Sequence, residues 1–563
     1  MENPVPDDSL ERRESKVPPG SSQDRGMCAE KRNDDRPEED GTLNSGGPVP
    51  HSMESIYLQG DPHDRHQGDL LGRNRESEPP IVVGDGKAVH RPPHPSGAVD
   101  KAKGLVGEQS GQSTHARDRN TPAQSVSRTL SALRAKAQKE PGHRFRGLAR
   151  LLNREMLSEA FGNLKRKASP GVDGVVWAGY AENLEGNLTD LEERLRSGRY
   201  RARWVKRRWI AKAGSKKLRP LGIPVLEDKI VQYAVKQILD SIWESEFHDE
   251  SIGYRAGKGA RLSSQELREA LNGGTYRWVV EADIRGFFDH VDHGWLVRML
   301  ELRIADRSLI RLIVKWLKAG VMEEGSEVIH PATGTPQGGV ISPILANIYL
   351  HCVQDEWIKK VVSKHSKGKV LFRRYADDSV VCFEHENDAR AYLRTLPKRL
   401  GKFSLSLAEE KSSLVRFDRK EPEQSGMFTF LGFDFYWARS RRNPRYVMVK
   451  RRTNRGKFRT SLKAMKEWLR KVRCRKLGEL LVVLRRKLLG YRNYYGVIGN
   501  SQMLSAYYYE VIRMLYKWLN RRSQRRSMTW AQFQRRLPGW NLPPARVVEV
   551  PLNPGLRQAK KPA

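Results

Sequence analysis

The pattern of apolar and polar residues divides the chain into three parts. Between residues 185 and 437, short runs of β-branched and aromatic residues alternate with segments in which apolar residues recur every three or four positions. The short runs predict strands, and the recurring spacing predicts amphipathic helices. Because the two kinds alternate, we expect an α+β fold with helices on one face of a mixed sheet. Residues 455–535 have helical spacing throughout.

Several elements can be bounded from this pattern. Residues 207–212 predict a strand that turns near Gly214 into a second strand holding Arg219. A further strand opens at Val279 and ends at Asp283. Helical spacing predicts helices at Arg144–Leu164, Lys229–Trp243, Leu309–Leu317 and Asp388–Leu400, and a leucine core at Leu477, Leu480, Leu481, Leu484 and Leu488.

The first 125 residues differ from the rest in composition. They contain one aromatic residue, Tyr57, and are rich in Pro, Gly, Ser, Asp and His. Such a segment cannot bury enough apolar surface to offset the entropy of the chain. We therefore expect residues 1–125 to be a disordered acidic extension that precedes the folded protein.

Charge is distributed unevenly along the chain, whose formal net charge is +36. Residues 1–125 carry 16 basic and 22 acidic residues, whereas residues 438–563 carry 33 basic and 4 acidic ones. A net charge of +29 on the last quarter repels itself unless a polyanion neutralises it. We expect nucleic acid as the partner rather than a membrane, because no apolar run approaches the roughly 18 residues of a spanning helix.

Two adjacent carboxylates stand at Asp377 and Asp378, between the apolar runs 370–372 and 379–383. This arrangement predicts a hairpin with two acids at its tip, and such acids repel each other unless a cation binds them. Mg²⁺ is usually held by one or two carboxylates together with substrate phosphates. A third acid, Asp283, follows the strand at Val279–Val280, so two strand ends can converge on a pair of Mg²⁺ ions.

A glycine-rich segment, Gly334–Gly339, lies between these acids. Glycine allows a backbone to approach a ligand closely. An apolar helix is expected to start after it, with Ser342 as the cap and Pro343 as the first helical residue.

The order Asp283, Pro336–Gly339 and Tyr375–Asp378 resembles the palm of a reverse transcriptase. Further segments resemble bacterial group II intron reverse transcriptases, and they are Ala168–Gly174, Arg219–Pro224, Asp228–Gln232, Gly253–Lys258, Phe428–Phe433 and Leu489–Gly496. The resemblance runs from about Arg144 to about Trp540. Within Gly253–Lys258, Tyr and Ala replace the Phe and Pro of the usual pattern.

The resemblance implies a right-hand polymerase fold. Residues 126–437 would form fingers and palm, residues 438–540 an all-helical thumb or maturase domain, and residues 541–563 a short basic tail that contacts DNA. The implied protein is an RNA-directed DNA polymerase that copies intron RNA into cDNA, and a maturase that promotes splicing and mobility. Its implied partners are group II intron RNA, an RNA template with a DNA or RNA primer, dNTPs and target DNA, and a homodimer is compatible with them.

The resemblance also implies roles at the site. Asp283 and Asp377 would bridge two Mg²⁺ ions, Asp378 would be a weaker ligand, and the Ile284 carbonyl would complete one shell. Phe288 would pack under the deoxyribose and exclude a 2′-hydroxyl, although Phe287 and Phe288 could both be core residues instead.

Four further residues are implied to bind the incoming nucleotide: Lys212, Arg219, Gln337 and Lys411. Gln337 would contact the nucleotide or its template pair, and Lys212 and Arg219 would bind the triphosphate. Lys411 is either a proton donor to pyrophosphate or an ordinary surface lysine.

In the helical region, aromatic residues interleave with cations, a pattern suited to stacking on bases and holding phosphates. Equally, half of these aromatics could simply pack the helices together. The predicted RNA-binding residues are Arg492, Arg513, Lys517, Arg521, Arg522, Arg525 and Arg526.

Two alternative functions remain open at this point. One is a splicing-only RNA-binding maturase, and the other is the reverse transcriptase of a retron, a diversity-generating element or a defence system. The four cysteines are scattered, which favours a reducing bacterial cytoplasm over a zinc or disulfide framework. Because no cysteine follows Cys474, we expect no Cys/His-rich endonuclease domain.

Overall fold

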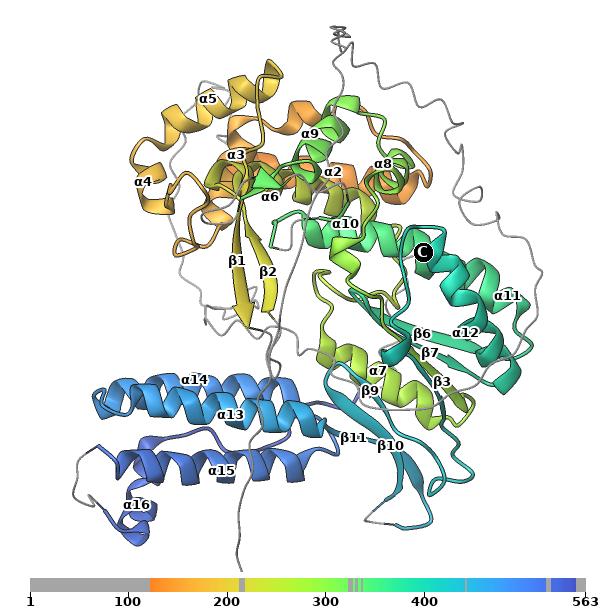
Figure 1. Ribbon diagram of the computed structural model, residues 1–563, viewed down its shortest axis with the longest axis vertical. Helices are drawn as coiled ribbons and strands as arrows, with labels where there is room; N and C mark the ends of the chain where they lie inside the picture. Colours follow the sequence, from red (N-terminus) through yellow and green to blue (C-terminus); the bar gives the residue numbers. More distant parts are fainter. Residues whose placement is uncertain are drawn as a thin grey trace, which may run out of the picture. The chain divides into compact units, whose positions relative to one another are not determined.

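A computed structural model describes residues 122–211, 218–322, 328–329, 333–335, 338–440, 443–522 and 528–552 (Figure 1). The extension expected over residues 1–125 lies outside this range except for its last four residues. Those four residues begin helix α2 (Pro122–Lys139), so folded protein starts slightly earlier than predicted.

Helices α2, α3 (Arg154–Asn163), α5 (Leu184–Arg196) and α6 (Leu226–Trp243) pack together around a shared apolar core. The single helix predicted over Arg144–Leu164 is wrong, because the segment contains a short turn η1 (Leu148–Leu151) before α3. The Asn153 side chain accepts the backbone N–H of Met156 and so caps a new helix at this point. Helix α4 (Trp177–Glu182) connects α3 to α5.

Strands β1 (Val205–Ala211) and β2 (Leu218–Ile223) form the predicted antiparallel pair. They belong to a sheet with the order β2-β1-β4-β5, in which β4 is Val321–Met322 and β5 is Val328–Ile329.

A second sheet has the order β6-β7-β3-β8 and is antiparallel throughout. Its strands are β3 (Trp278–Ala282), β6 (Val370–Tyr375), β7 (Asp378–Phe383) and β8 (Ser413–Arg416). Helices α10 (Ser342–Leu350) and α12 (Glu386–Gly401) share an apolar core with one face of this sheet. The N-cap of α10 is Ile341 rather than the predicted Ser342.

The other face of this sheet is also covered, contrary to the expectation of helices on one face only. Residues of α7 (Ala260–Asn272) and of a third sheet, β11-β10-β9, pack against it. The strands of the third sheet are β9 (Phe428–Phe430), β10 (Phe433–Arg439) and β11 (Val447–Thr453). Strand β10 crosses the predicted domain boundary at 437/438, so that boundary cuts a continuous strand.

The predicted helical region consists of α13 (Arg455–Val472), α14 (Leu477–Tyr495), α15 (Ser501–Leu519) and α16 (Trp530–Arg536). Four of the five leucines predicted as core are buried, and Leu477 is half-buried. The Thr529 hydroxyl and the Gln532 side chain form a capping box that starts α16.

The described part of the segment predicted as a short basic tail packs against the rest of the fold. The Glu549 carboxylate is buried against the Arg451 guanidinium, with Nη2 and Oε2 2.5 Å apart, and Gln265 donates to the Val550 carbonyl at 2.8 Å. These bonds hold Glu549 and Val550 against strand β11 and helix α7, with Glu549 buried and the Val550 side chain exposed.

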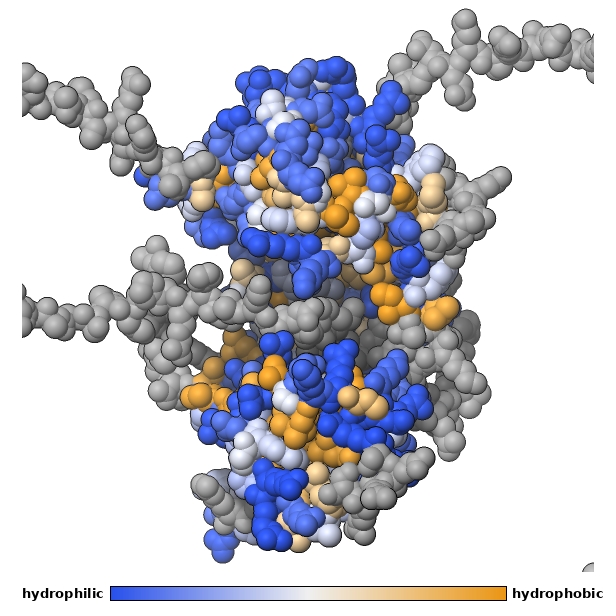
Figure 2. Space-filling model, turned by 90° about the vertical axis from the view of Figure 1, so that its left-hand side faces the viewer, coloured by the Kyte–Doolittle hydropathy of each residue, from blue (hydrophilic) through white to orange (hydrophobic). Residues whose placement is uncertain are grey.

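The remaining elements connect these layers. They are α8 (His293–Glu301), α9 (Arg307–Leu317), α11 (Ser363–His365), the 3₁₀ turns η2 (Phe287–Asp289), η5 (Glu409–Lys411) and η6 (Pro538–Trp540), and the π-helical turns η3 (His351–Asp355) and η4 (Ile358–Val362). Hydrophilic residues predominate over much of the coloured surface in Figure 2. None of the described helices is both long enough and apolar enough to cross a membrane.

Candidate active site

The acids predicted from the sequence come together at one end of the β6-β7-β3-β8 sheet. Strand β3 pairs with β7 so that Ala282 lies opposite Ser379. Continuing this register by one residue places Asp283 opposite Asp378, and directly opposed residues of antiparallel strands have Cβ atoms roughly 4.5–5.5 Å apart. Side chains two or four residues apart on a strand point to the same face, so Asp283 lies on the face of Val279 and Asp378 on the face of Val380. Val279 and Val380 pack in the same core, and the two acids therefore share one face of the sheet.

Strands β6 and β7 are joined by a two-residue turn, Ala376-Asp377, between the paired residues Tyr375 and Asp378. Ala376 has a φ of 56°, a left-handed conformation that costs a residue with a Cβ about 1–2 kcal/mol. Gly253 lies against this turn, because a Cβ at Gly253 would stand only 2.4 Å from the Ala376 nitrogen. The close approach explains why a glycine occupies this position in the Gly253–Lys258 motif.

A buried arginine beneath the turn holds it in place. The Arg374 guanidinium donates from Nε and Nη2 to both carboxylate oxygens of Asp355, at 2.7 and 2.6 Å. Nη2 also donates to the Ser251 hydroxyl, and Nη1 donates to the Ala376 carbonyl at 3.0 Å. The strained turn is therefore tied to helix α10 and its π-helical continuation through one side chain.

Asp283 and Ile284 continue strand β3 beside the segment at Leu407. The Asp283 carbonyl accepts the Ala408 N–H at 2.8 Å, and the Arg285 N–H donates to Ser406. Because successive carbonyls of an extended strand point to opposite edges, the Ile284 carbonyl faces the edge toward β7. The Ile284 carbonyl therefore points toward the strand that carries Asp378.

Lys411 contacts one of these acids directly. Its Nζ donates to Oδ2 of Asp283 at 2.8 Å, and both side chains are about one-third exposed. Lys411 ends the 3₁₀ turn η5 immediately before strand β8, which pairs with β3. This contact places Lys411 beside Asp283, and its role as a proton donor stays a prediction.

Phe288 follows Asp283 by five residues and is largely buried, at 9% exposure. Its ring meets that of Phe287 edge-on at 5.3 Å, and its carbonyl accepts the N–H of Thr335 at 2.8 Å. Phe288 thus adjoins the segment that leads into the glycine-rich loop. Its ring is more exposed than that of Phe287, which has 2% exposure.

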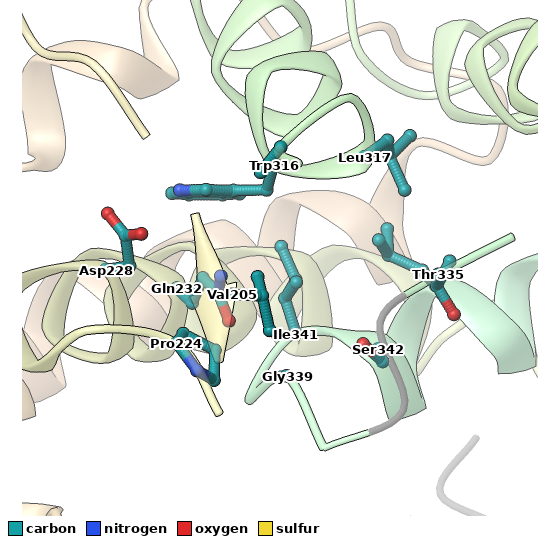
Figure 3. A pocket seen from close by; sticks show the side chains of 12 residues that line it. Val205, Pro224, Asp228, Gln232, Trp316, Leu317, Thr335, Gly339, Ile341 and Ser342 are labelled. Atoms are coloured by element: carbon teal, nitrogen blue, oxygen red, sulfur yellow. The ribbon is translucent and has the colours of Figure 1, made fainter. Parts of the chain in front are cut away.

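The glycine-rich loop makes close backbone contacts within the protein. Gly338 has a φ of 109°, and a Cβ there would stand 2.5 Å from the Gly222 carbonyl of strand β2. The Val340 N–H donates to the Gln232 side chain at 3.0 Å. Gln232, Asp228 and Trp316 surround a small cavity beside β1 and this loop (Figure 3). Gly338 therefore lies close to strand β2, and the approach to a ligand predicted for this segment stays a prediction.

The charges of Arg219 on strand β2 and Asp377 at the turn both influence the pKa of Tyr254. Partial burial raises the pKa of Tyr254, the charge of Asp377 raises it further, and the charge of Arg219 lowers it. The basic residue predicted to bind a triphosphate therefore lies within electrostatic reach of the acids. Lys212 and Gln337 lie outside the described residues.

The family model described as reverse transcriptase (RNA-dependent DNA polymerase) matches residues 210–435. The chain is 28% identical to the group II intron-encoded protein LtrA of Lactococcus lactis subsp. cremoris, over 64% of this chain and 72% of LtrA. It is 33% identical to protein YkfC of Escherichia coli strain K12, over 54% of this chain and 87% of YkfC.

The chain is a group II intron reverse transcriptase. It is accordingly an RNA-directed DNA polymerase, and its relatives include nuclear intron maturase 1 of Arabidopsis thaliana, 28% identical over 17% of this chain and 13% of that protein. Reverse transcriptases use divalent metal ions, and the three carboxylates and the Ile284 carbonyl are the hard oxygen donors that such ions prefer. The group II intron reverse transcriptase therefore has a donor set that fits its cofactor.

The predicted RNA-binding residues of this reverse transcriptase lie on its helical region. Arg513 and Lys517 are exposed on α15, Arg521 is exposed just after it, and Arg492 and Arg522 are half-buried. Arg525 and Arg526 lie outside the described residues. Among the interleaved aromatics, Tyr507 and Trp518 are buried whereas Tyr509 is 56% exposed. Part of this aromatic set thus packs the helices, as the sequence allowed.

The sequence did not single out Arg374, Asp355 or Tyr494. Arg374 lies two residues after the apolar Phe372 on the same predicted strand, so its side chain points to the same buried face. This spacing could have indicated that Arg374 is buried and paired with an acid. The Tyr494 ring on α14 stacks on Phe433 at 5.8 Å, and its hydroxyl donates to Leu431. Burial raises the pKa of Tyr494, and the charge of Asp378 adds to the shift, so the last turn of α14 lies near the acids.

Proposed function

We propose that Asp283, Asp377 and Asp378, with the Ile284 carbonyl, hold two Mg²⁺ ions at which the reverse transcriptase adds dNTPs to a primer on an RNA template. The observation that carries this proposal is the strand register that sets Asp283 opposite Asp378. Two carboxylates this close repel each other, so the arrangement favours cation binding. Bound Mg²⁺ would activate the 3′-hydroxyl and neutralise the departing pyrophosphate.

The surrounding residues would position the nucleotide. Arg219 and Lys212 bind the triphosphate, and Gln337 contacts the nucleotide or its template pair. Phe288 packs against the deoxyribose, where a 2′-hydroxyl would clash. Lys411, held 2.8 Å from Asp283, is close enough to the acids to donate a proton to pyrophosphate.

A separate surface would bind the intron RNA. Residues 438–563 carry a net charge of +29, and helix α15 exposes Arg513 and Lys517. Such cations neutralise phosphates and release counterions. We place the start of this RNA-binding module at Arg455, where the helices begin, rather than at residue 438. The same module would promote splicing by stabilising the folded intron.

The test is primer extension on an RNA template with Mg²⁺ and dNTPs, comparing the wild type with Asp377→Asn/Asp378→Asn. The variant should lose at least about 10³-fold in rate, because the charge that binds the metal is removed. Its affinity for intron RNA should be unchanged, which controls for folding. Normal polymerisation by the double variant would contradict the site assignment.

A further inference from the structure

A cluster of two histidines and a glutamate lies apart from the proposed catalytic carboxylates. One ligand atom each from His248, His351 and Glu356 lies within 4.8 Å of the others. His248 follows helix α6, whereas His351 begins the π-helical turn η3 after α10 and Glu356 directly follows that turn. His351 and Glu356 are buried, and the His248 side chain keeps 26% exposure. The cluster is thus inside the protein but reachable from one side.

The distances within the cluster suit a small metal ion. Nε2 of His248 lies 2.6 Å from Oε1 of Glu356, and Nε2 of His351 lies 3.7 Å from the same oxygen. Ligands at about 2.0–2.1 Å from a tetrahedral Zn²⁺ are separated by roughly 3.3 Å, between these two values. Small side-chain rotations would therefore bring all three atoms onto one ion.

The imidazole nitrogens are incompletely satisfied, since the partner of Nε2 of His248 is the close Glu356 carboxylate. Within the part of the chain that the structure describes, neither Nε2 of His248 nor Nδ1 of His351 makes an aligned hydrogen bond. A buried polar atom without a partner is costly, and native proteins rarely leave one. Oδ2 of Asp355 lies 3.8 Å from Nδ1 of His351, which is beyond hydrogen-bond distance. A small shift of the ring would let this carboxylate orient the histidine, as carboxylates commonly do for metal-binding histidines.

The backbone explains how the two helical ligands meet. The Glu356 N–H donates to the His351 carbonyl, an i→i+5 bond that marks a π-helical turn. In a regular α-helix residues five apart point in different directions, whereas the wider π turn brings them to one face. Such turns are rare and frequently occur at functional sites.

We propose that His248, His351 and Glu356 form a zinc-binding site, with a fourth position open to water. Imidazole and carboxylate ligands in this combination suit Zn²⁺. Lys360 holds the other oxygen of Glu356 at 2.9 Å, which fixes the orientation of the carboxylate.

Bound Zn²⁺ would join the segment after α6 to the π-helical turn η3 that continues α10. That segment continues to Ser251 and Gly253, which contact Arg374 and the Ala376 turn. The helix supplies Asp355 to the same arginine. Zn²⁺ would therefore stabilise both segments that hold the β6–β7 turn. This structural role would be separate from the catalytic role proposed for Mg²⁺.

The test is titration of the full-length, chelator-stripped protein with Zn²⁺ in the presence of Mg²⁺. We expect one Zn²⁺ per chain and a rise in the thermal unfolding midpoint, with Co²⁺ giving the visible absorption of a tetrahedral site. His248→Gln, at a partly exposed position that should fold normally, and Glu356→Gln should weaken Zn²⁺ binding by more than about 100-fold.

Two control variants separate this site from others. His365→Gln changes an exposed histidine outside the cluster, and Asp377→Asn/Asp378→Asn removes catalytic carboxylates. Both should bind Zn²⁺ as the wild type does. The proposal is overturned if the wild type binds no Zn²⁺ at micromolar concentration, if His248→Gln binds normally, or if the aspartate variant loses the ion.

Discussion

Arg374 and Asp355 form a bidentate ion pair in which neither side chain is exposed to solvent. The same arginine donates to the carbonyl of Ala376, the left-handed residue of the catalytic turn. The pair therefore couples the stability of the palm to the geometry of the site. Removing one partner of a buried pair costs about 3–5 kcal/mol, because the other charge is left uncompensated.

Arg374→Met should consequently destabilise the protein by about 3–5 kcal/mol. The double variant Arg374→Met/Asp355→Leu should recover much of that stability, because apolar residues can replace a buried ion pair. It should not recover polymerase activity, since the bond to Ala376 is still missing. Urea unfolding and primer extension measure the two effects, with Arg373→Met as the neighbouring control. Full activity in the double variant would show that the arginine does not position the turn.

Lys411 can be tested by comparing two substitutions. Lys411→Met should lower the single-turnover rate by about 10²-fold or more if the lysine donates a proton. Lys411→Arg keeps the charge beside Asp283 but is a poor donor, because the guanidinium hardly ever deprotonates. Equal losses in the two variants indicate proton donation. Rescue by arginine would mean that Lys411 acts only by holding Asp283.

Phe288→Ala should admit rNTPs more readily, by about tenfold or more in the ratio of dNTP to rNTP incorporation. The reason is steric, since the ring would otherwise meet the 2′-hydroxyl. Phe287→Leu is the matched control, because Phe287 is more deeply buried and should affect stability alone. If Phe288→Ala leaves the ratio of dNTP to rNTP incorporation unchanged, Phe288 has a structural role only.

Charge reversal at Arg521, Arg522, Arg525 and Arg526 should weaken binding to intron RNA and splicing, while sparing most polymerisation on an unrelated template. The affinity of the wild type should fall with salt, with a slope of about −0.7 to −0.9 per phosphate contact. The reversed variant should have a shallower slope. Splicing assays near physiological Mg²⁺, with Asp377→Asn/Asp378→Asn as a splicing-competent control, separate the two functions. A variant with reversed charges that splices normally would argue against this surface.

The pH dependence of stability has a specific source at Asp228. Burial raises the pKa of this carboxyl to about 6, although it accepts hydrogen bonds from the Tyr200 hydroxyl and the Arg203 N–H. A raised pKa means that its contribution to stability is present below pH 3.8, the ordinary value, and is lost as the pH rises through about 6. Asp228→Asn does not ionise; its Oδ1 can still accept the Arg203 N–H, whereas its Nδ2 would donate to the Tyr200 hydroxyl.

Relative to the wild type, Asp228→Asn should therefore gain up to about 3 kcal/mol in the free energy of unfolding between pH 4 and pH 7. Chemical denaturation at several pH values measures this difference. A difference that stays constant over this range would show that Asp228 does not titrate between these pH values.

Much of the fold and the centre of the site follow from local patterns. Strand periodicity located β3, β6 and β7. The acids at the ends of these strands could be predicted to lie close together once the strands were assumed to end at the same edge of one sheet. Helical spacing located α6, α9 and α12 within a few residues, because an amphipathic face is encoded by neighbouring residues. The helical region and its leucine core followed for the same reason.

What the sequence by itself determined is therefore whatever depends on residues close together in the chain: the strands, the helices, the family motifs and the excess of positive charge. Tertiary structure decided the rest. Arg374 meets Ser251 and Asp355, and His248 meets His351 and Glu356, across separations of 19 to more than 100 residues. No local periodicity encodes such meetings, because they depend on how the palm sheet, α6 and the π-helical turn pack together.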